Sequence, residues 1–319
     1  MSSSKWRSLF MAASISAAAS VTAAPDNQTL TLVVGLAPGG GVDTVARVVA
    51  QEMSKVMNRS VIVENKPGAG GIIAAQDVAR SPAAAARYLF SGPSTLIGPY
   101  VQTVTYDLDK DFVPVGLVGG QVLAVAVSAS TPFRTFEDLL QAAKEKPGSL
   151  SYASTGMGSQ HHLAGEQLSS LANIDMVHVP YKGASQAAQD LSAGHIPVAI
   201  TSLTAVMPQV EAGKIRILAV MSPQRMPELP DIPSVAETFP GFESVTSLFV
   251  LAPANADPQT VDRMAQALEA ALRAPNVKEA LRTQYSLIDF RGPEATREWM
   301  NQERKRWEEV VRKANVRLD

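Results

Sequence analysis

The chain of 319 residues contains no cysteine. This excludes disulfide bonds, cysteine-ligated metal centres and a thiol nucleophile, and it fits a protein that works in an oxidising compartment. Charged residues make up only 18% of the chain, aromatic residues make up 6%, and the net charge is −2. A balance this close to neutral gives no reason to expect a nucleic acid or an anionic membrane as partner.

Long uncharged apolar stretches are also scarce, and the clearest one lies at the N-terminus. Residues 9–21 follow the basic residues Lys5 and Arg7 and are too short to span a bilayer. Val21-Thr22-Ala23 supplies small residues before a cleavage point. The sequence therefore predicts a secretory signal peptide at residues 1–23 and an exported mature chain that begins near Ala24.

The rest of the chain is organised around residues 30–57. An apolar, β-branched run at 30–36 predicts a buried strand, a Pro-Gly-Gly-Gly turn follows, and apolar residues recur at helical spacing from Val42 to Met57. Such a turn presents backbone N–H groups at the positive end of a helix, which suits an anion, although a tight turn without a ligand remains the alternative. Asp43 stands where an N-cap or first-turn acid is favoured, so we expect it to cap the helix and to shape the loop indirectly.

The order of strand, polar glycine turn and helix returns twice. It is predicted at 60–80, with the turn at 66–71, and at 150–171, with the turn at 155–160. The turn at 66–71 resembles a dinucleotide fingerprint, but Ile73 occupies the position of the third glycine. We therefore expect no nicotinamide site.

Further segments continue this alternation. Short apolar runs predict strands at 88–91, 113–127, 177–179, 198–201, 215–220 and 245–252, and helices are expected at 136–146, 184–194, 257–274 and 293–314. The pattern predicts an α/β fold of parallel sheets with covered faces. If the chain crosses over near 118–129 and returns near Val245, the early and middle glycine turns belong to two domains that face one cleft, the geometry of a closing binding protein.

Four spaced segments resemble the Bug family, the periplasmic solute receptors of tripartite tricarboxylate transporters. They are Ala37–Arg47, Val63–Gly71, Tyr152–Leu163 and Val179–Gly183, and the resemblance extends from Leu30 to the C-terminus. It implies a type II-like periplasmic binding protein with a ligand cleft between two hinged domains, which we place at 24–124 with 249–319 and at 125–248. It also implies a small carboxylate ligand, membrane transporter subunits as partners, no cofactor and no catalysis.

The same resemblance assigns the site. The loops Pro38–Asp43 and Ser154–Gln160 are expected to hold the ligand carboxylate through backbone N–H groups, hydroxyls and bridging water. Four hydroxyl residues are expected to line the cleft, and one aromatic ring to supply an apolar wall. The expected ligand-binding residues are Gly39, Gly40, Gly41, Asp43, Ser91, Thr95, Ser154, Thr155, Gly158, Ser159, Gln160, Thr201, Ser202 and Phe249.

Two departures from the family pattern stand out. Ala85-Ala86-Arg87-Tyr88 replaces the usual Asp-Gly-Tyr before a strand, and four alanines, 83–86, occupy a turn. Ser247-Leu248-Phe249 stands where the family often has a tryptophan. The first puts the local turn geometry in question, and the second changes the expected cleft wall.

The histidines are candidates for catalytic or metal-binding groups. His161 and His162 are adjacent on a helix and point about 100° apart, so they cannot share a metal ion, and we expect one to face the interior or cleft and the other solvent. The Ser159–His161 pair lacks the flanking glycines of a nucleophile elbow. His178 and His195 are expected to be structural. Lys182 is a candidate partner for a carboxylate, but an exposed turn lysine is the more common case.

The sequence thus favours an exported, monomeric, non-enzymatic receptor for a small carboxylate. Few cationic residues accompany the loops, so we expect a mono- or dicarboxylate with an aromatic or apolar body. One alternative is a sensor subunit that presents its ligand to a signalling partner. Another is an α/β enzyme that binds a phosphate-bearing cofactor, which the incomplete fingerprint and the missing acid–base constellation disfavour.

Overall fold

The computed structural model describes residues 28–314 and 316–318, so the predicted signal peptide at 1–23 lies outside the described residues. The strands are β1 (Leu30–Val34), β2 (Val61–Asn65), β3 (Arg87–Ser91), β4 (Phe112–Ser128), β5 (Leu150–Ser154), β6 (Met176–Pro180), β7 (Val198–Ser202), β8 (Ile215–Val220), β9 (Val245–Pro253) and β10 (Ser286–Arg291). The α-helices are α1 (Gly41–Met57), α2 (Ile72–Ala79), α3 (Ser94–Val101), α4 (Phe136–Glu145), α5 (Gln160–Ala172), α6 (Ala184–Ala193), α7 (Leu203–Glu211), α8 (Val235–Thr238), α9 (Pro258–Arg273), α10 (Pro275–Thr283) and α11 (Pro293–Ala314).

The strands form one mixed ten-stranded sheet in the order β2-β1-β3-β9-β4-β7-β5-β6, with β8 and β10 also paired to β4. The βα units pair in parallel, as β1 does with β2 and β3, and β5 with β6 and β7. The prediction of parallel sheets is confirmed for these units and wrong for the other strands, because β9 runs antiparallel to β3 and β4, and β4 runs antiparallel to β7, β8 and β10. The antiparallel pairs arise because β4 carries the chain from the first half to the second and β9 carries it back.

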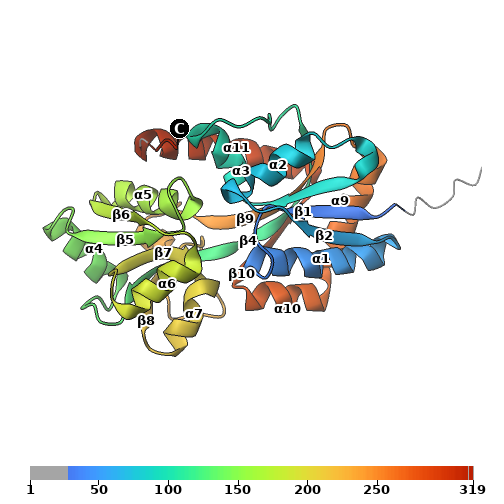
Figure 1. Cartoon of the computed structure of the whole chain (residues 1–319). Helices are drawn as coiled ribbons and strands as arrows, with labels where there is room; N and C mark the ends of the chain where they lie inside the picture. Colours follow the sequence, from blue (N-terminus) through green and yellow to red (C-terminus); the bar gives the residue numbers. More distant parts are fainter. Residues whose placement is uncertain (1–27, 315, 319) are drawn as a thin grey trace, which may run out of the picture.

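Two lobes lie at either end of this sheet, and β4 and β9 run between them (Figure 1). The buried hydrophobic clusters divide in the same way. One group joins β1, β3, the first half of β4 and β9 to α1, α2, α9 and α10, and the other joins the second half of β4 and β5–β8 to α4–α7. The fold is that of a two-domain periplasmic binding protein.

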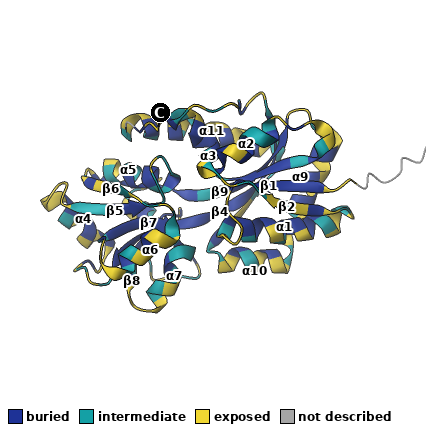
Figure 2. Cartoon of the chain, in the orientation of Figure 1, coloured by how far each residue is buried: buried dark blue, intermediate teal, exposed yellow. Residues whose placement is uncertain are grey.

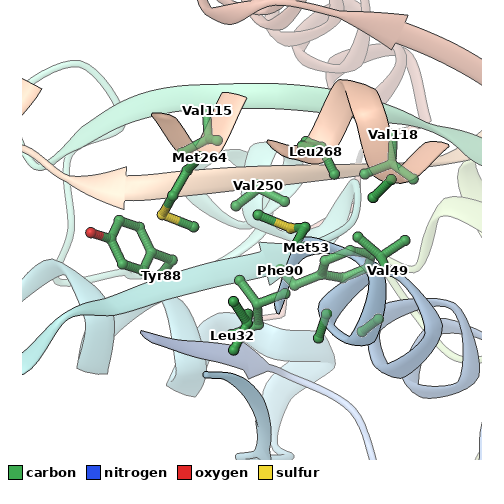
Figure 3. Close-up of a cluster of buried hydrophobic side chains, with 14 of the residues drawn as sticks. Leu32, Val49, Met53, Tyr88, Phe90, Val115, Val118, Val250, Met264 and Leu268 are labelled. Carbon is green, nitrogen blue, oxygen red and sulfur yellow. The ribbon is translucent and has the colours of Figure 1, made fainter. Parts of the chain in front are cut away.

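Helices cover both faces of the sheet in the first lobe. On one face, α1 and α9 pack their apolar stripes onto β1, β3, β4 and β9, where Val49, Met53 and Met264 meet Phe90 and Val250 (Figure 3). On the other face lie α2, α3 and the start of α11. The apolar face that the helical spacing of α1 predicted is confirmed, and its burial against the sheet stabilises this lobe.

The second lobe repeats this arrangement. The strand β7 and the second half of β5 are buried in its interior, β6 is a partly exposed edge strand, and the outer faces of α4 and α6 are exposed (Figure 2). Tyr152 of β5 is fully buried among Leu139 of α4 and Ala164 and Leu168 of α5. The opposite face of the sheet carries alanines beneath α6, which lets that helix approach closely.

Glycines allow β4 to pass from one lobe to the other. Gly119 has φ +137°, and a Cβ there would lie 2.0 Å from the carbonyl oxygen of Leu287 on β10. A Cβ on Gly120 would lie 2.4 Å from Cγ1 of Val245 on β9. The predicted crossing region therefore forms one strand of 17 residues whose middle cannot carry side chains.

The C-terminal helix α11 contacts both lobes. Its Trp307 is fully buried and packs with Ile97 of α3 and Leu163 of α5. The indole Nε1 of Trp307 donates a 3.0 Å hydrogen bond to Oε2 of Glu303 one turn earlier. The predicted helix at 293–314 is confirmed, and it joins the two lobes along one side (Figure 1).

Four helices, α3, α7, α8 and α10, and the strand β10 differ from the sequence-based expectation. α3 begins within the segment 92–95, where a polar turn is expected, and it contains Pro99; α7 contains Pro208. α10 and β10 fill the interval between the two predicted C-terminal helices. Proline inside a helix breaks the sequence signal, whereas packing against the sheet compensates for the lost hydrogen bond.

The four alanines form a short 3₁₀ turn at Ala83–Ala85 that ends in Ala86 with φ +49°. Ala86 therefore takes the left-handed conformation that glycine adopts without strain. Its carbonyl accepts a 2.9 Å hydrogen bond from the N–H of Thr31, so β1 is held despite the substitution. Among the described residues, no helix is long and apolar enough to cross a membrane.

Candidate functional site

The first candidate loop precedes α1. Gly40 is the N-cap of α1 and makes no side-chain cap, so the expectation that Asp43 caps the helix is corrected. Asp43 lies in the first turn instead, where its Oδ2 accepts a 2.9 Å hydrogen bond from the N–H of Gly39 and its Oδ1 accepts one of 2.8 Å from Asn65. Asp43 thus fixes the shape of the loop while Gly39 and Gly40 remain exposed.

The charge of Asp43 is compensated within the protein. Nε of Arg47 donates to Oδ2 of Asp43 at 2.9 Å. Burial raises the pKa of Asp43, but the hydrogen bonds from Arg47, Gly39 and Asn65 outweigh it and hold the pKa below its usual value. The N-terminal N–H groups of α1 are therefore not left facing an unpaired carboxylate, which would repel an anionic ligand.

The second candidate loop follows β5. Ser159 is the N-cap of α5, since its Oγ accepts a 3.2 Å hydrogen bond from the N–H of His162, and it donates to the carbonyl of Gly156 at 2.7 Å. Ser154 bonds both the N–H and the carbonyl of Gly156 at 3.1 Å. The loop is folded on itself, with Met157 exposed at its tip.

Three histidines lie directly behind this loop. Nδ1 of His161 lies 2.8 Å from Oγ1 of Thr155, Nδ1 of His162 accepts a 3.1 Å hydrogen bond from the N–H of Gly158, and Nε2 of His178 lies 2.6 Å from Oγ of Ser154. The rings of His162 and His178 stack at 3.7 Å. The expectation that His161 or His162 faces solvent is wrong, because His162 is buried and Nε2 of His161 is buried as well.

All three imidazoles favour the neutral form. Burial lowers the pKa of His161 and of His178 to about 4, and burial together with the neighbouring His178 lowers the pKa of His162 to about 4. His178 is therefore not an isolated structural residue but a member of this cluster. His195 is exposed and lies 3.4 Å from Asp190.

The two loops converge on the same point of the β4–β9 pair. Nε2 of Gln121 on β4 lies 2.2 Å from where a Cβ of Gly41 would be. Nε2 of Gln160, the first residue of α5, donates a 2.7 Å hydrogen bond to the carbonyl of Val245 on β9. Gln121 pairs with Thr246, the neighbour of Val245, so the loops meet the two strands within one residue of each other.

Three of the predicted cleft hydroxyls lie at strand ends, and the fourth, that of Thr95, lies in the first turn of α3. Oγ of Ser91 and Oγ1 of Thr95 are 2.5 Å apart, and both residues are buried. Thr201 is fully buried, and its Oγ1 lacks a hydrogen-bond partner among the described residues; Ser202 is half-buried at the start of α7. Thr155, Gly158 and Ser159 are half-buried, whereas Ser154 and Gln160 are buried.

Phe249 does not form a cleft wall. Its side chain is fully buried in the core beneath α2 and α3, and its ring centroid lies 5.7 Å from that of Trp299 on α11. Residues alternate across β9, so Phe249 and Leu251 face this core. The prediction for Phe249 is therefore wrong. Lys182 is exposed in the turn after β6, and its backbone N–H donates a long, 3.4 Å hydrogen bond to Oε1 of Gln186.

Sequence reasoning named Gln160 but missed two other polar residues beside the meeting point, Gln121 and Thr246. Oε1 of Gln160 and Oγ1 of Thr246 are buried and, among the described residues, have no hydrogen-bond partner. Gln121 is also buried. Buried polar atoms without partners are costly, so these groups are suited to bind an added polar molecule. The positions of Gln121 and Thr246, far from both loops in the sequence, gave no local signal.

The site contains no arrangement typical of catalysis among the residues that the structure describes. Ser159 caps α5 and is not paired with His161, whose Nδ1 faces Thr155. Ser154 is bonded to His178, but Nδ1 of that ring is buried without a partner in the described structure, so no acid orients it as in a triad. Within residues 28–314 and 316–318, no group of three or more His, Asp or Glu side chains is placed to hold a metal ion.

Comparison with known proteins agrees with this geometry. The family of tripartite tricarboxylate transporter receptors matches residues 45–316. A UPF0065 protein encoded between tcbD and tcbE in Pseudomonas sp. strain P51 is 36% identical over 288 residues, covering 89% of this chain and 86% of that protein. Protein BugT of Bordetella pertussis is 31% identical over 293 residues, covering 90% and 89%.

Solved structures agree as well. R. palustris Rpa4515 with adipate has a TM-score of 0.81 at 30% identity, covering 91% of this chain and 98% of that one. MatC from Rhodopseudomonas palustris with bound malate has a TM-score of 0.76 at 27% identity, covering 89% and 98%. The chain belongs to the receptor family of the tripartite tricarboxylate transporters, the TctC-like Bug family.

Proposed function

We propose that this protein captures one small mono- or dicarboxylate between the loops 38–43 and 154–160 and delivers it to the membrane subunits of a transporter. The first N–H groups of α1 and α5 would bind the carboxylate, because the first turn of a helix leaves its N–H groups without partners inside the helix. Hydroxyls of Thr155, Thr201 and Ser202 would add hydrogen bonds.

One observation carries this proposal: both helix N-termini reach the same point of β4 and β9. Gly41 abuts Gln121, and Gln160 is bonded to Val245 in the adjacent strand. Two positive helix ends from different lobes would therefore act on one ligand, and the partnerless Oε1 of Gln160 would orient its polar groups. The related proteins that hold adipate and malate support a carboxylate as the class of ligand.

The charge near the loops supports a ligand with few carboxylates. Arg47 is the cation beside the first loop, and its Nε and Nη2 bond Asp43 and Asn65. Binding by backbone N–H groups supplies partial charges only, so a ligand with three carboxylates would be poorly compensated. We therefore infer a mono- or dicarboxylate whose remaining body is aromatic or apolar.

The proposal includes location and organisation. We place the mature chain in the periplasm as a monomer, with domains at 24–124 with 249–319 and at 125–248. Membership in a periplasmic receptor family supports this location. The strands β4 and β9, which join the lobes, would be the hinge about which the domains close on the ligand.

A glycine substitution tests the site. Gly40 has φ −78°, and the nearest atom to an added Cβ is the carbonyl oxygen of Ala37 at 3.7 Å, so Gly40→Leu is expected to fold. Its side chain would cover the N-terminal N–H groups of α1. Gly292 also precedes a helix and has nothing within 4 Å of an added Cβ, so Gly292→Leu is the matched control.

The variants are titrated by calorimetry with adipate, malate and benzoate. We expect the wild type and Gly292→Leu to bind at least one of them with equal affinity, and Gly40→Leu to lose at least about 100-fold, close to 3 kcal/mol. Equal affinity of Gly40→Leu and wild type would show that the ligand does not use the α1 loop.

A further inference from the structure

Three of the four histidines of this chain gather behind one candidate ligand loop, and each contacts a different residue of that loop. We propose that His161, His162 and His178 are positioning residues that hold the loop 154–159 in its ligand-binding shape only as neutral imidazoles, so that acid frees the loop. This inference rests on the proposed function for its link to the ligand, but the state of the loop is measurable without one.

The contact of His162 fixes its protonation state. A backbone N–H can only donate, so the bond from Gly158 requires a bare Nδ1 on His162 and places the ring proton on Nε2. Nε2 lies 3.7 Å from Oε1 of Glu166, which also accepts a 2.7 Å hydrogen bond from the hydroxyl of Tyr152. A proton added at Nδ1 would meet the N–H of Gly158 and break that bond.

The other two rings contact earlier residues of the loop. His178 holds the hydroxyl of Ser154, which in turn bonds the N–H and carbonyl of Gly156. His161 holds the hydroxyl of Thr155. Nδ1 of His178 and Nε2 of His161 are buried and have no partner among the described residues, so a charge on either ring would be uncompensated there.

The stack of His162 on His178 couples these contacts. The ring centroids are 3.7 Å apart with 14° between the planes, so two positive charges would repel strongly. Titratable and charged groups surround the cluster on each neighbouring element. Tyr152 lies on β5 and Glu166 on α5. Arg306 and Glu309 of α11 line a groove together with Glu166, and Tyr181 and Lys182 follow β6. Among the described residues, Glu166 is the acid recorded beside the stack, with its Oε1 3.7 Å from Nε2 of His162, which is beyond hydrogen-bond range.

Burial lowers the pKa of each of the three rings to about 4. A ring freed by loop opening returns toward a pKa of about 6.5. The open loop therefore binds more protons than the closed loop at low pH. For each imidazole that is freed, the equilibrium constant for loop opening is roughly 30-fold larger at pH 5 than at pH 8.

Selective labelling makes the claim testable. With ¹⁵N-histidine, only four ring pairs give signals, and single variants assign them. We expect His162 to show the Nε2–H tautomer at pH 7 and all three clustered rings to stay neutral at pH 5.5. A protonated Nδ1 on His162 at pH 7 would overturn the proposal.

Paired variants separate positioning from simple stability. The Oδ1 of an asparagine can replace Nδ1 as an acceptor, so His162→Asn is the conservative variant and His162→Leu removes the acceptor. His195→Asn is the control, because the ring of His195 is exposed and its recorded contact is with Asp190 and not with the loop. The readouts are amide hydrogen exchange of peptides covering 154–159, corrected for intrinsic rates, and affinity for adipate, malate and benzoate.

We expect His162→Leu to raise exchange in 154–159 at least about tenfold and to weaken carboxylate binding similarly, while exchange in β8 stays unchanged. His162→Asn should recover most of both, and His195→Asn should match the wild type. In the wild type, protection of 154–159 should fall at least about tenfold between pH 7 and pH 5.

The two proposals fail in different ways. If no carboxylate binds the wild type, the proposed function fails, whereas exchange and tautomer still decide the role of the histidines. If carboxylates bind and His162→Leu leaves exchange in 154–159 unchanged, the positioning role is overturned and the proposed function stands.

Discussion

The carboxylate of Asp43 accepts a 2.9 Å hydrogen bond from the N–H of Gly39, four residues earlier in the chain. This bond closes the loop before α1 and leaves the N–H groups of the first helical turn directed outward. The same carboxylate is held by Arg47 and Asn65, so its negative charge does not compete with a ligand. Asp43 thus shapes the loop of the candidate anion site.

Asp43→Asn is expected to loosen this loop. An amide has one oxygen, so it cannot accept from Gly39, Arg47 and Asn65 together, and at least one of these donors loses its partner. We expect a loss of about 1–3 kcal/mol in the free energy of unfolding and weaker carboxylate binding, measured by urea unfolding and calorimetry.

Asp138→Asn is the matched control for that variant. Asp138 accepts hydrogen bonds from the N–H groups of Arg134 and Thr135 before α4, remote from the site. It should lose stability without changing affinity. If both variants bind carboxylates equally, the Asp43 loop has no part in binding. Because hydrogen bonds lower the pKa of Asp43, its stabilising effect is present above about pH 4 and is lost as the pH falls below that value.

Gly119→Ala should destabilise the crossing of β4 between the lobes. The backbone at φ +137° excludes L-residues almost entirely, and the added Cβ would lie 2.0 Å from the carbonyl oxygen of Leu287. We expect a loss of about 3 kcal/mol or more, which lowers the melting temperature by roughly 6 °C or more. Gly292→Ala, which has open space around its Cβ, should melt within about 1 °C of the wild type. Equal melting temperatures would contradict the described strand pairing.

Ala86→Gly should stabilise the protein. Alanine in the left-handed region costs about 1–2 kcal/mol, of which the greater freedom of glycine in the unfolded chain offsets about 0.4–1 kcal/mol. We expect a net gain of roughly 0.5–1 kcal/mol by urea unfolding. Ala85→Gly, outside the left-handed region, should instead destabilise. A loss of stability in Ala86→Gly would contradict the conformation at φ +49°.

The buried histidines should make the folded state sensitive to mild acid. Their pKa values of about 4 lie below the unfolded value, so the unfolded chain takes up more protons between about pH 6.5 and pH 4. Stability is therefore complete above that window and falls as the pH drops through it. Calorimetric melting at pH 7.5, 6.0 and 5.0 should show a steady decline, and a double variant His162→Asn with His178→Gln should show a smaller one. A flat profile in the wild type would mean that these rings are not buried.

The βα units were predictable because their signals are local. The apolar run, glycine turn and helical spacing at 30–57 required no knowledge of distant residues, and β1 and α1 formed as expected. The helices α3 and α7 were missed because Pro99 and Pro208 interrupt their sequence signal, although tertiary packing tolerates them.

The site was predictable only in outline. Its two loops could be located from their glycines, but the stack of His162 on His178 depends on the parallel register of β5 and β6, which places Tyr152 beside His178. The error at Phe249 has a similar cause, since the face of β9 toward which a side chain points is set by pairing with β3 and β4. Such relations between distant residues leave no mark in one sequence.

The most direct test of the proposed function is a calorimetric titration of the mature chain, residues 24–319, after denaturing extraction and refolding to remove any bound compound. The titrants are adipate, malate, benzoate and the uncharged diamide of adipic acid. We predict one binding site with a Kd of about 10 µM or tighter for at least one of the three carboxylates, near −7 kcal/mol, and no heat from the diamide. Binding of the diamide as tightly as adipate, or of none of the carboxylates, would contradict a carboxylate receptor built on the N-termini of α1 and α5.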